Sequence, residues 1–246
     1  MKEVTGGYNT YGFSIGILMN ESTFPRIPGD LGNATTFEFP VRLKVVRGAW
    51  YARVVVQGDQ KLLEPFLQAA KELEAEGVKA ITTNCGFLAM FQKQLAAAVK
   101  VPVFTSSLML VPLVYRMLSP DQKVGIMTVN SAALTERHYN GAGWSPSEIP
   151  VVIAGLENEK IFTRVFADDL QTLDFDAMAE DMVTVAKRLV SEHPEVGAIV
   201  FECTNMAPYV HEVQQAVGLP IFDIQLVDRC YSHLFIIYPD FGTARF

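Results

Sequence analysis

Residues 78–108 read VKAITTNCGFLAMFQKQLAAAVKVPVFTSSL, and residues 196–226 read VGAIVFECTNMAPYVHEVQQAVGLPIFDIQL. The two stretches align without a gap and share ten identical residues in 31 positions, among them the cysteines Cys85 and Cys203. Each stretch reads as an apolar strand, a turn that carries the cysteine, a helical segment and a second strand. A repeated unit of this kind predicts two similar lobes, each built around a parallel sheet.

A second, fainter repeat lies ahead of each unit. The segment SIGILMNES at 14–22 corresponds to KVGIMTVNS at 123–131, and both are glycine-bearing strands that lead into Asn and Ser. Turn residues interrupt the pattern at 119–121, which marks a boundary between the lobes. We therefore predict two lobes related by a pseudo-twofold axis with a cleft between them: residues 1–118 with about 218–246, and residues 119–217.

Short runs rich in Val, Ile and Phe alternate with longer segments of helical period, a pattern typical of parallel strands joined by crossover helices. Apolar residues recur at helical spacing from Leu62 to Leu73 and from Met178 to Leu189. These patterns predict an α/β fold with two doubly wound parallel-sheet lobes. The expected strands cover residues 13–19, 52–57, 78–83, 101–105, 123–129, 149–154, 196–202 and 219–223.

The composition excludes several classes of function. The chain has 246 residues, 50% of them hydrophobic, and a formal net charge of −7, which argues against nucleic acid or an anionic membrane surface as a partner. No apolar run reaches the roughly 20 residues that a membrane span needs. The first apolar run leads into Asn20 and Glu21 rather than a cleavage site, and three cysteines are too few for a disulfide framework, so we expect a cytoplasmic protein. The composition is compatible with a homo-oligomer, although the sequence identifies no interface.

The two repeated cysteines are the candidate catalytic residues. Cys85 and Cys203 each follow a buried strand and precede a helix, which places both at the carboxyl ends of their sheets, where open α/β sheets bind ligands. Free N–H groups at a helix start stabilise a thiolate, so we expect thiol pKa values lowered from about 8.5 toward neutrality. Two such turns would present thiols to opposite faces of one small molecule, one removing a proton and the other returning one.

Residues beside the cysteines are the candidate substrate-binding groups, since small and polar side chains let backbone amides approach a substrate carboxylate. A loop rich in Pro, Gly and Asn follows the first strand and would overhang the cleft, adding Ser22, Arg26 and Asp30 as further candidates. We expect no metal, because Cys230 and His233 form only half of a metal site. The predicted substrate-binding residues are Asn20, Asn84, Gly86, Glu202, Thr204 and Asn205.

The motifs TNCG at 83–86 and ECTNMAPY at 202–209 resemble the aspartate/glutamate/hydantoin racemase superfamily. The resemblance implies a cofactor-independent cysteine pair in a cleft between related lobes. The superfamily also includes maleate isomerase and arylmalonate decarboxylase. Glutamate racemases carry Asn-Thr after the first cysteine and His two residues after the second, where this chain has Gly86, Phe87 and Asn205. The chain therefore departs from a plain glutamate racemase.

Taken together, these features predict a racemase or epimerase that acts next to a carboxylate or hydantoin carbonyl, with Cys85 and Cys203 as alternating base and acid. One alternative is a maleate-type cis–trans isomerase in which a cysteine adds covalently to an alkene diacid. Another is a non-catalytic protein that binds small molecules, because two-lobed α/β architectures are widely reused for binding.

Overall fold

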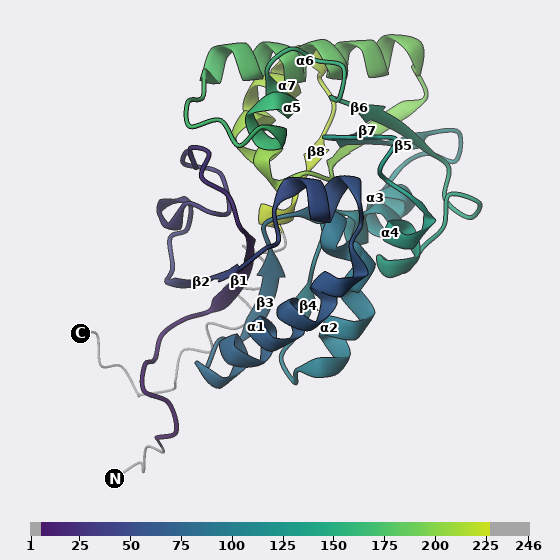
Figure 1. Ribbon diagram of the computed structural model, residues 1–246. Helices are drawn as coiled ribbons and strands as arrows, with labels where there is room; N and C mark the ends of the chain where they lie inside the picture. Colours follow the sequence, from purple (N-terminus) through teal and green to yellow (C-terminus); the bar gives the residue numbers. More distant parts are fainter. Residues whose placement is uncertain (1–5, 227–246) are drawn as a thin grey trace, which may run out of the picture.

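Two parallel sheets form the framework of the computed structural model, which describes residues 6–226 (Figure 1). The first sheet has the strand order β2-β1-β3-β4 and the second the order β6-β5-β7-β8. Every strand pairing in both sheets is parallel, so the predicted α/β class with two related sheets is confirmed. The strands are β1 (Ile15–Asn20), β2 (Val41–Val46), β3 (Ala80–Thr83), β4 (Val103–Phe104), β5 (Lys123–Thr128), β6 (Val151–Gly155), β7 (Val196–Phe201) and β8 (Ile221–Phe222).

Helices flank both sheets, and the two sheets with their helices occupy opposite halves of the molecule in Figure 1. The α-helices are α1 (Leu63–Ala75), α2 (Gln92–Ala98), α3 (Val111–Met117), α4 (Glu136–Gly141), α5 (Phe162–Ala167), α6 (Phe175–Glu192) and α7 (Val210–Val217). Shorter turns of helix are η1 (Ala34–Thr36), η2 (Ala52–Val56), η3 (Gln60–Leu62), η4 (Gly86–Phe91), η5 (Ser107–Leu110) and η6 (Thr204–Tyr209).

The glycine shared by the two fainter repeats lets a helix approach the middle of each sheet. A Cβ at Gly16 of β1 would overlap the side chain of Leu73, and one at Gly125 of β5 would press on Leu189. Both leucines are buried and end the predicted apolar stripes of α1 and α6. The same close contact between strand and helix thus recurs in both lobes, as the repeat predicts.

One expected strand is wrong. Residues 52–57 form the π-helix η2, and the strand beside β1 is instead Val41–Val46. The run RVVV at 53–56 has the β-branched composition of a strand, but a short apolar run cannot be assigned by periodicity alone. β2 lies at the edge of its sheet and only its last residue, Val46, is buried, so its mixed sequence VRLKVV lacks the continuous apolarity of the central strands.

The boundaries of the lobes stay a prediction. The turn at 119–121 lies between α3 and β5, and β8 pairs with β7, so the chain up to Phe222 runs with the second sheet. Residues 227–246, with Cys230 and His233, lie outside the described residues.

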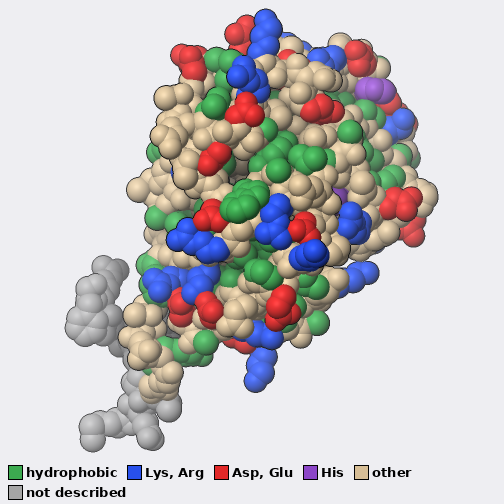
Figure 2. All heavy atoms as spheres, viewed as in Figure 1, with side chains coloured by type: hydrophobic (Ala, Val, Ile, Leu, Met, Phe, Trp, Pro, Cys, Tyr) green, Lys and Arg blue, Asp and Glu red, His purple; other side chains and the backbone are tan. Residues whose placement is uncertain are grey.

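The described surface shows no sign of a single dominant charge on the face in Figure 2, where cationic and anionic side chains are interspersed. Within residues 6–226, no helix is both long enough and apolar enough to cross a bilayer.

Candidate active site

The two cysteine turns are built alike. Cys85 connects β3 to η4, and Cys203 connects β7 to η6, so each thiol lies at the carboxyl end of a central strand. In each lobe the residue before the cysteine donates its backbone N–H to the neighbouring central strand: Asn84 to Leu18 at 3.0 Å in the first lobe, and Glu202 to Met127 at 2.8 Å in the second. The repeat therefore holds both thiols in equivalent places.

Both thiols line one cavity of about 250 Å³. Of the predicted site residues, the structure brings together Asn20, Asn84, Cys85, Glu202, Cys203 and Asn205 in its lining. Both cysteines are free thiols. The remaining lining residues are Glu21, Ser22, Phe24, Arg26, Trp50, Tyr51, Ala52, Val55, Phe87, Val129, Phe166, Ala167, Asp168 and Asp169.

Gly86 and Thr204 are not in the lining and instead join the two turns. A Cβ at Gly86 would overlap the carbonyl oxygen and the Oε1 atom of Glu202, so only glycine allows this approach. The Thr204 hydroxyl donates to the carbonyl oxygen of Asn84 across the two lobes. Both residues therefore fix the separation of the cysteine turns.

The pKa values of both thiols are raised, whereas we expected them to be lowered. Burial, with the nearby Glu202 carboxyl acting in the same direction, raises the pKa of Cys85 to about 12. Burial also raises the pKa of Cys203 well above its ordinary value, with Glu202 and Cys85 acting in the same direction. The backbone N–H groups of Phe87 and Asn205 favour the thiolates, but they do not offset the effect of burial.

Glu202 is a fully buried carboxyl group in the wall of the cavity. Burial raises its pKa to about 8, although the Thr128 hydroxyl donates to its Oε2 atom at 2.8 Å. Its Oε1 atom has no hydrogen-bond partner among the described residues. At neutral pH this side chain is therefore mainly protonated and is a hydrogen-bond donor.

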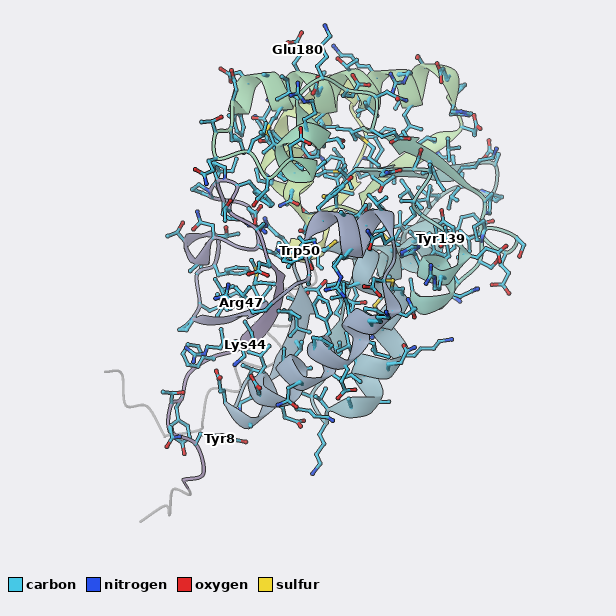
Figure 3. All side chains as sticks on the ribbon, in the orientation of Figure 1. Tyr8, Lys44, Arg47, Trp50, Tyr139 and Glu180 are labelled. Atoms are coloured by element: carbon cyan, nitrogen blue, oxygen red, sulfur yellow. The ribbon has the colours of Figure 1, made fainter. Side chains whose placement is uncertain are left out.

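Aromatic rings and carboxylates surround the rest of the cavity. Trp50 lies between the two lobes just before η2 and is 51% exposed (Figure 3). Arg26 is the one Lys or Arg side chain in the lining; it pairs with Asp30 and lies over the ring of Phe24. The site thus offers apolar and anionic surface with a single cation. The remaining aromatic lining residues are Tyr51, Phe87 and Phe166, and the remaining acidic ones are Glu21, Glu202, Asp168 and Asp169.

Asp169 fastens the loop after β1 to the second lobe. Its carboxylate accepts from the backbone N–H of Thr23 at 2.7 Å, the Thr23 hydroxyl at 2.8 Å and the backbone N–H of Phe24 at 3.0 Å. It holds this place with a φ of +49°, a conformation that few residues other than glycine adopt. The loop that we expected to overhang the cleft therefore does so, with Asn20, Ser22 and Arg26 in the lining.

Our sequence analysis missed Trp50, Tyr51 and Asp169. The aromatic pair directly precedes the run that we assigned to a strand, and recognising that run as a helix at the end of the first sheet would have brought both rings to the cleft. Asp169 has no comparable signal, because its partners lie 145 and 146 residues away along the chain.

A family model described as Asp/Glu/Hydantoin racemase matches residues 56–227. The chain is 30% identical over 237 residues to a protein named dimethylsulfoniopropionate lyase from Durusdinium sp. clade D, covering 93% of this chain and 77% of that protein. It is 29% identical over 241 residues to dimethylsulfoniopropionate lyase 7 from Emiliania huxleyi, covering 94% and 69% respectively.

Solved structures show the same fold. A mutant of arylmalonate decarboxylase in its sulfate-associated form has a TM-score of 0.61 at 16% identity, with 94% of this chain and 95% of that chain covered. A glutamate racemase from Bacillus anthracis has a TM-score of 0.57 at 14% identity, with 91% and 83% covered.

These relatives correct our expectation of function. The sequence analysis predicted a racemase or epimerase, with a cis–trans isomerase or a non-catalytic binding protein as alternatives. That prediction is wrong, because relatives at about 30% identity over nearly the whole chain are named lyases. The family model and the names of the relatives thus differ in the reaction they indicate, so the motifs at the cysteine turns indicate the family but not the reaction.

Proposed function

Since the chain belongs to the Asp/Glu/hydantoin racemase family of enzymes, we propose that it is a lyase that eliminates a cationic β-substituent from a small carboxylate, with dimethylsulfoniopropionate as its substrate. The observation that carries the proposal is a cavity that combines two thiols with aromatic rings, carboxylates and a single arginine. The relatives' names supply the identity of the substrate.

The shape and charge of the cavity suit such a substrate. Dimethylsulfoniopropionate carries a carboxylate at one end and a sulfonium cation at the other, and a cavity of about 250 Å³ suits a molecule below drug size. We expect the sulfonium group to contact Trp50 and Tyr51, because aromatic faces attract cations. The lining also contains the carboxylates of Asp168 and Glu21, which pair with Arg164 and Arg47, and we expect the substrate carboxylate to contact Arg26.

The reaction needs one base. A thiolate takes a proton from the carbon next to the carboxylate, the C–H electron pair forms the new carbon–carbon double bond, and the carbon–sulfur bond breaks with its pair going to the sulfonium sulfur. The products are acrylate and neutral dimethyl sulfide, and the proton stays on the cysteine until it passes to solvent. Cys85 and Cys203 are the candidate bases, since both thiols line the cavity.

The substrate itself helps to form the thiolate. Burial raises the pKa values of both thiols, and the cationic end of the substrate beside the sulfurs would lower them. The protonated Glu202 meanwhile provides a hydrogen-bond donor where negative charge develops on the substrate carboxylate. Charge is thus created in the cavity only when the correct substrate is present.

The proposal is tested by incubating the purified protein with dimethylsulfoniopropionate and measuring dimethyl sulfide in the headspace and acrylate by proton NMR. We expect the two products in equal amounts. The neutral thioether 3-(methylthio)propionate is the matched control, and it should remain intact because it has neither the cation nor a good leaving group. Folded protein that yields no dimethyl sulfide would overturn the proposal.

A further inference from the structure

The thiol of Cys203 has a hydrogen-bond acceptor fixed beside it. Its Sγ atom lies 3.5 Å from the Oδ1 atom of Asn205 and donates to it. The amide nitrogen of Asn205 donates in turn to the Oδ2 atom of Asp30 at 2.6 Å. Asp30 comes from the loop after β1 in the other lobe and is only 3% exposed. A chain of three residues therefore connects the second cysteine to a buried carboxylate.

The charge of Asp30 determines which way the Asn205 amide faces. Arg26 donates to the Oδ1 atom of Asp30 at 2.9 Å, and the backbone N–H of Gly32 donates to the same oxygen at 2.6 Å. A carboxylate held in this way accepts hydrogen bonds and cannot donate one, so it must face the NH₂ group of Asn205. The opposite end of the amide, a pure acceptor, is then turned toward Cys203. An acceptor at this position favours the protonated sulfur over the thiolate.

Cys85 has different surroundings, because Asn20 and Arg26 line the cavity with it. The backbone N–H of Phe87, the side chain of Asn20 and the charge of Arg26 all favour its thiolate, whereas at Cys203 only the backbone N–H of Asn205 does so. Asn20 is itself held in place, because its backbone N–H donates to the Oδ1 atom of Asn84 at 2.7 Å. Donors and a nearby cation favour a thiolate. The carboxyl group of Glu202 raises the pKa values of both thiols, whereas the carboxylate of Asp30 raises that of Cys203.

We propose that Cys85 is the base of the reaction and that Asp30 is a positioning residue, which holds Cys203 as a neutral thiol by orienting Asn205. The assignment of a base rests on the proposed elimination, whereas the difference between the two thiols does not. Elimination of a sulfonium group needs no acid, because the leaving group departs as a neutral sulfide. A second thiol that keeps its proton is therefore compatible with the whole reaction.

The proposal is tested by alkylating the protein with iodoacetamide in the absence of substrate and measuring the rate at each cysteine by peptide mass spectrometry, from neutral pH to about pH 10. In the wild type we expect Cys85 to react at lower pH than Cys203. Asp30→Asn removes the charge and frees the Asn205 amide to turn its NH₂ group toward the sulfur. We expect alkylation of Cys203 to become faster relative to Cys85, by about tenfold in thiolate fraction for each unit by which its pKa falls.

A second variant and a control keep the result interpretable. Asn205→Ala removes the acceptor and leaves the ion pair of Asp30 and Arg26 in place. It should also make alkylation of Cys203 faster relative to Cys85. Asp59→Asn breaks a similar Asp–Arg pair outside the cavity, with Arg53, and should change neither rate. If Asp30 had only a structural role, Asp30→Asn would make the alkylation of both cysteines faster to a similar extent. Selective alkylation of Cys203 in the wild type, or a ratio of rates unchanged in Asp30→Asn and Asn205→Ala, would overturn the proposal.

The activity measurement is independent of this result. If the protein releases dimethyl sulfide, Cys85→Ala should abolish release and Cys203→Ala should retain part of it. If the protein releases none, the proposed function fails, yet the alkylation ratio still decides whether Asp30 and Asn205 distinguish the two thiols.

Discussion

Replacing Glu202 by Gln should make the protein more stable at alkaline pH. The folded protein holds this carboxyl at a pKa of about 8, against 4.5 for an ordinary glutamate, because the group is buried. At a pH between these two pKa values, Glu202 has lost its proton in the unfolded chain and has kept it in the folded protein. Stability therefore falls as pH rises across this window, and the fall ends once the folded group also ionises.

The magnitude follows from the width of that window. Each pKa unit corresponds to about 1.4 kcal/mol, so Glu202 costs the wild type up to about 5 kcal/mol of unfolding free energy by pH 8. The Gln variant keeps an acceptor for the Thr128 hydroxyl and has nothing to ionise, so it should avoid this cost. At about pH 4.5 and below, the two proteins should differ little.

The assay is urea unfolding of the wild type and Glu202→Gln at a series of pH values from about 5 to about 9. The control is Glu195→Gln. Hydrogen bonds and the Lys123 charge lower the pKa of Glu195, so that carboxylate is ionised in both states throughout this range. The unfolding free energy of Glu195→Gln should change with pH in the same way as that of the wild type. The unfolding free energy of Glu202→Gln should instead exceed that of the wild type by an amount that grows as pH rises. If the unfolding free energies of Glu202→Gln and the wild type changed with pH in the same way, the conclusion that the folded protein keeps Glu202 protonated would be refuted.

Three further predictions concern packing, binding and the loop. Gly86→Ala should lower the unfolding free energy by about 1–3 kcal/mol, because the new Cβ overlaps Glu202; unchanged thermal unfolding would contradict this close contact. Trp50→Ala should raise KM for the sulfonium substrate about threefold to tenfold, the worth of a cation–π contact, while binding of acrylate stays the same; an unchanged KM would remove the aromatic contact. Asp169→Ala should destabilise the loop after β1 by about 1–2 kcal/mol and speed hydrogen exchange at Thr23 relative to the wild type; exchange as slow as in the wild type would show that the carboxylate does not fasten the loop.

The internal repeat carried most of what the sequence could predict. Because Cys85 and Cys203 occupy the same position in two strand–helix–strand units, one argument placed both at sheet ends, and the structure finds both in one cavity. The loop after β1 was also expected at the cleft. Local pattern failed at residues 52–57, where RVVV suits a strand in composition but the chain forms a π-helix.

Properties that depend on both lobes together could not be predicted. The start of a helix is visible in sequence and suggested acidic thiols, but burial between the lobes raises the pKa of Cys85 instead. The pairing of Asn205 with Asp30 joins residues 175 positions apart and has no local signal. The proposed substrate could not be predicted for a related reason. Gly86 and Asn205 depart from glutamate racemases, but the aromatic and acidic residues that would suit a cation come from separate segments.

Release of dimethyl sulfide by the wild type and by Cys85→Ser, followed in parallel with acrylate formation, tests the central claim most directly. The account predicts equal amounts of both products from the wild type and neither product from the folded Cys85→Ser variant. Product formed at an undiminished rate by Cys85→Ser would contradict it.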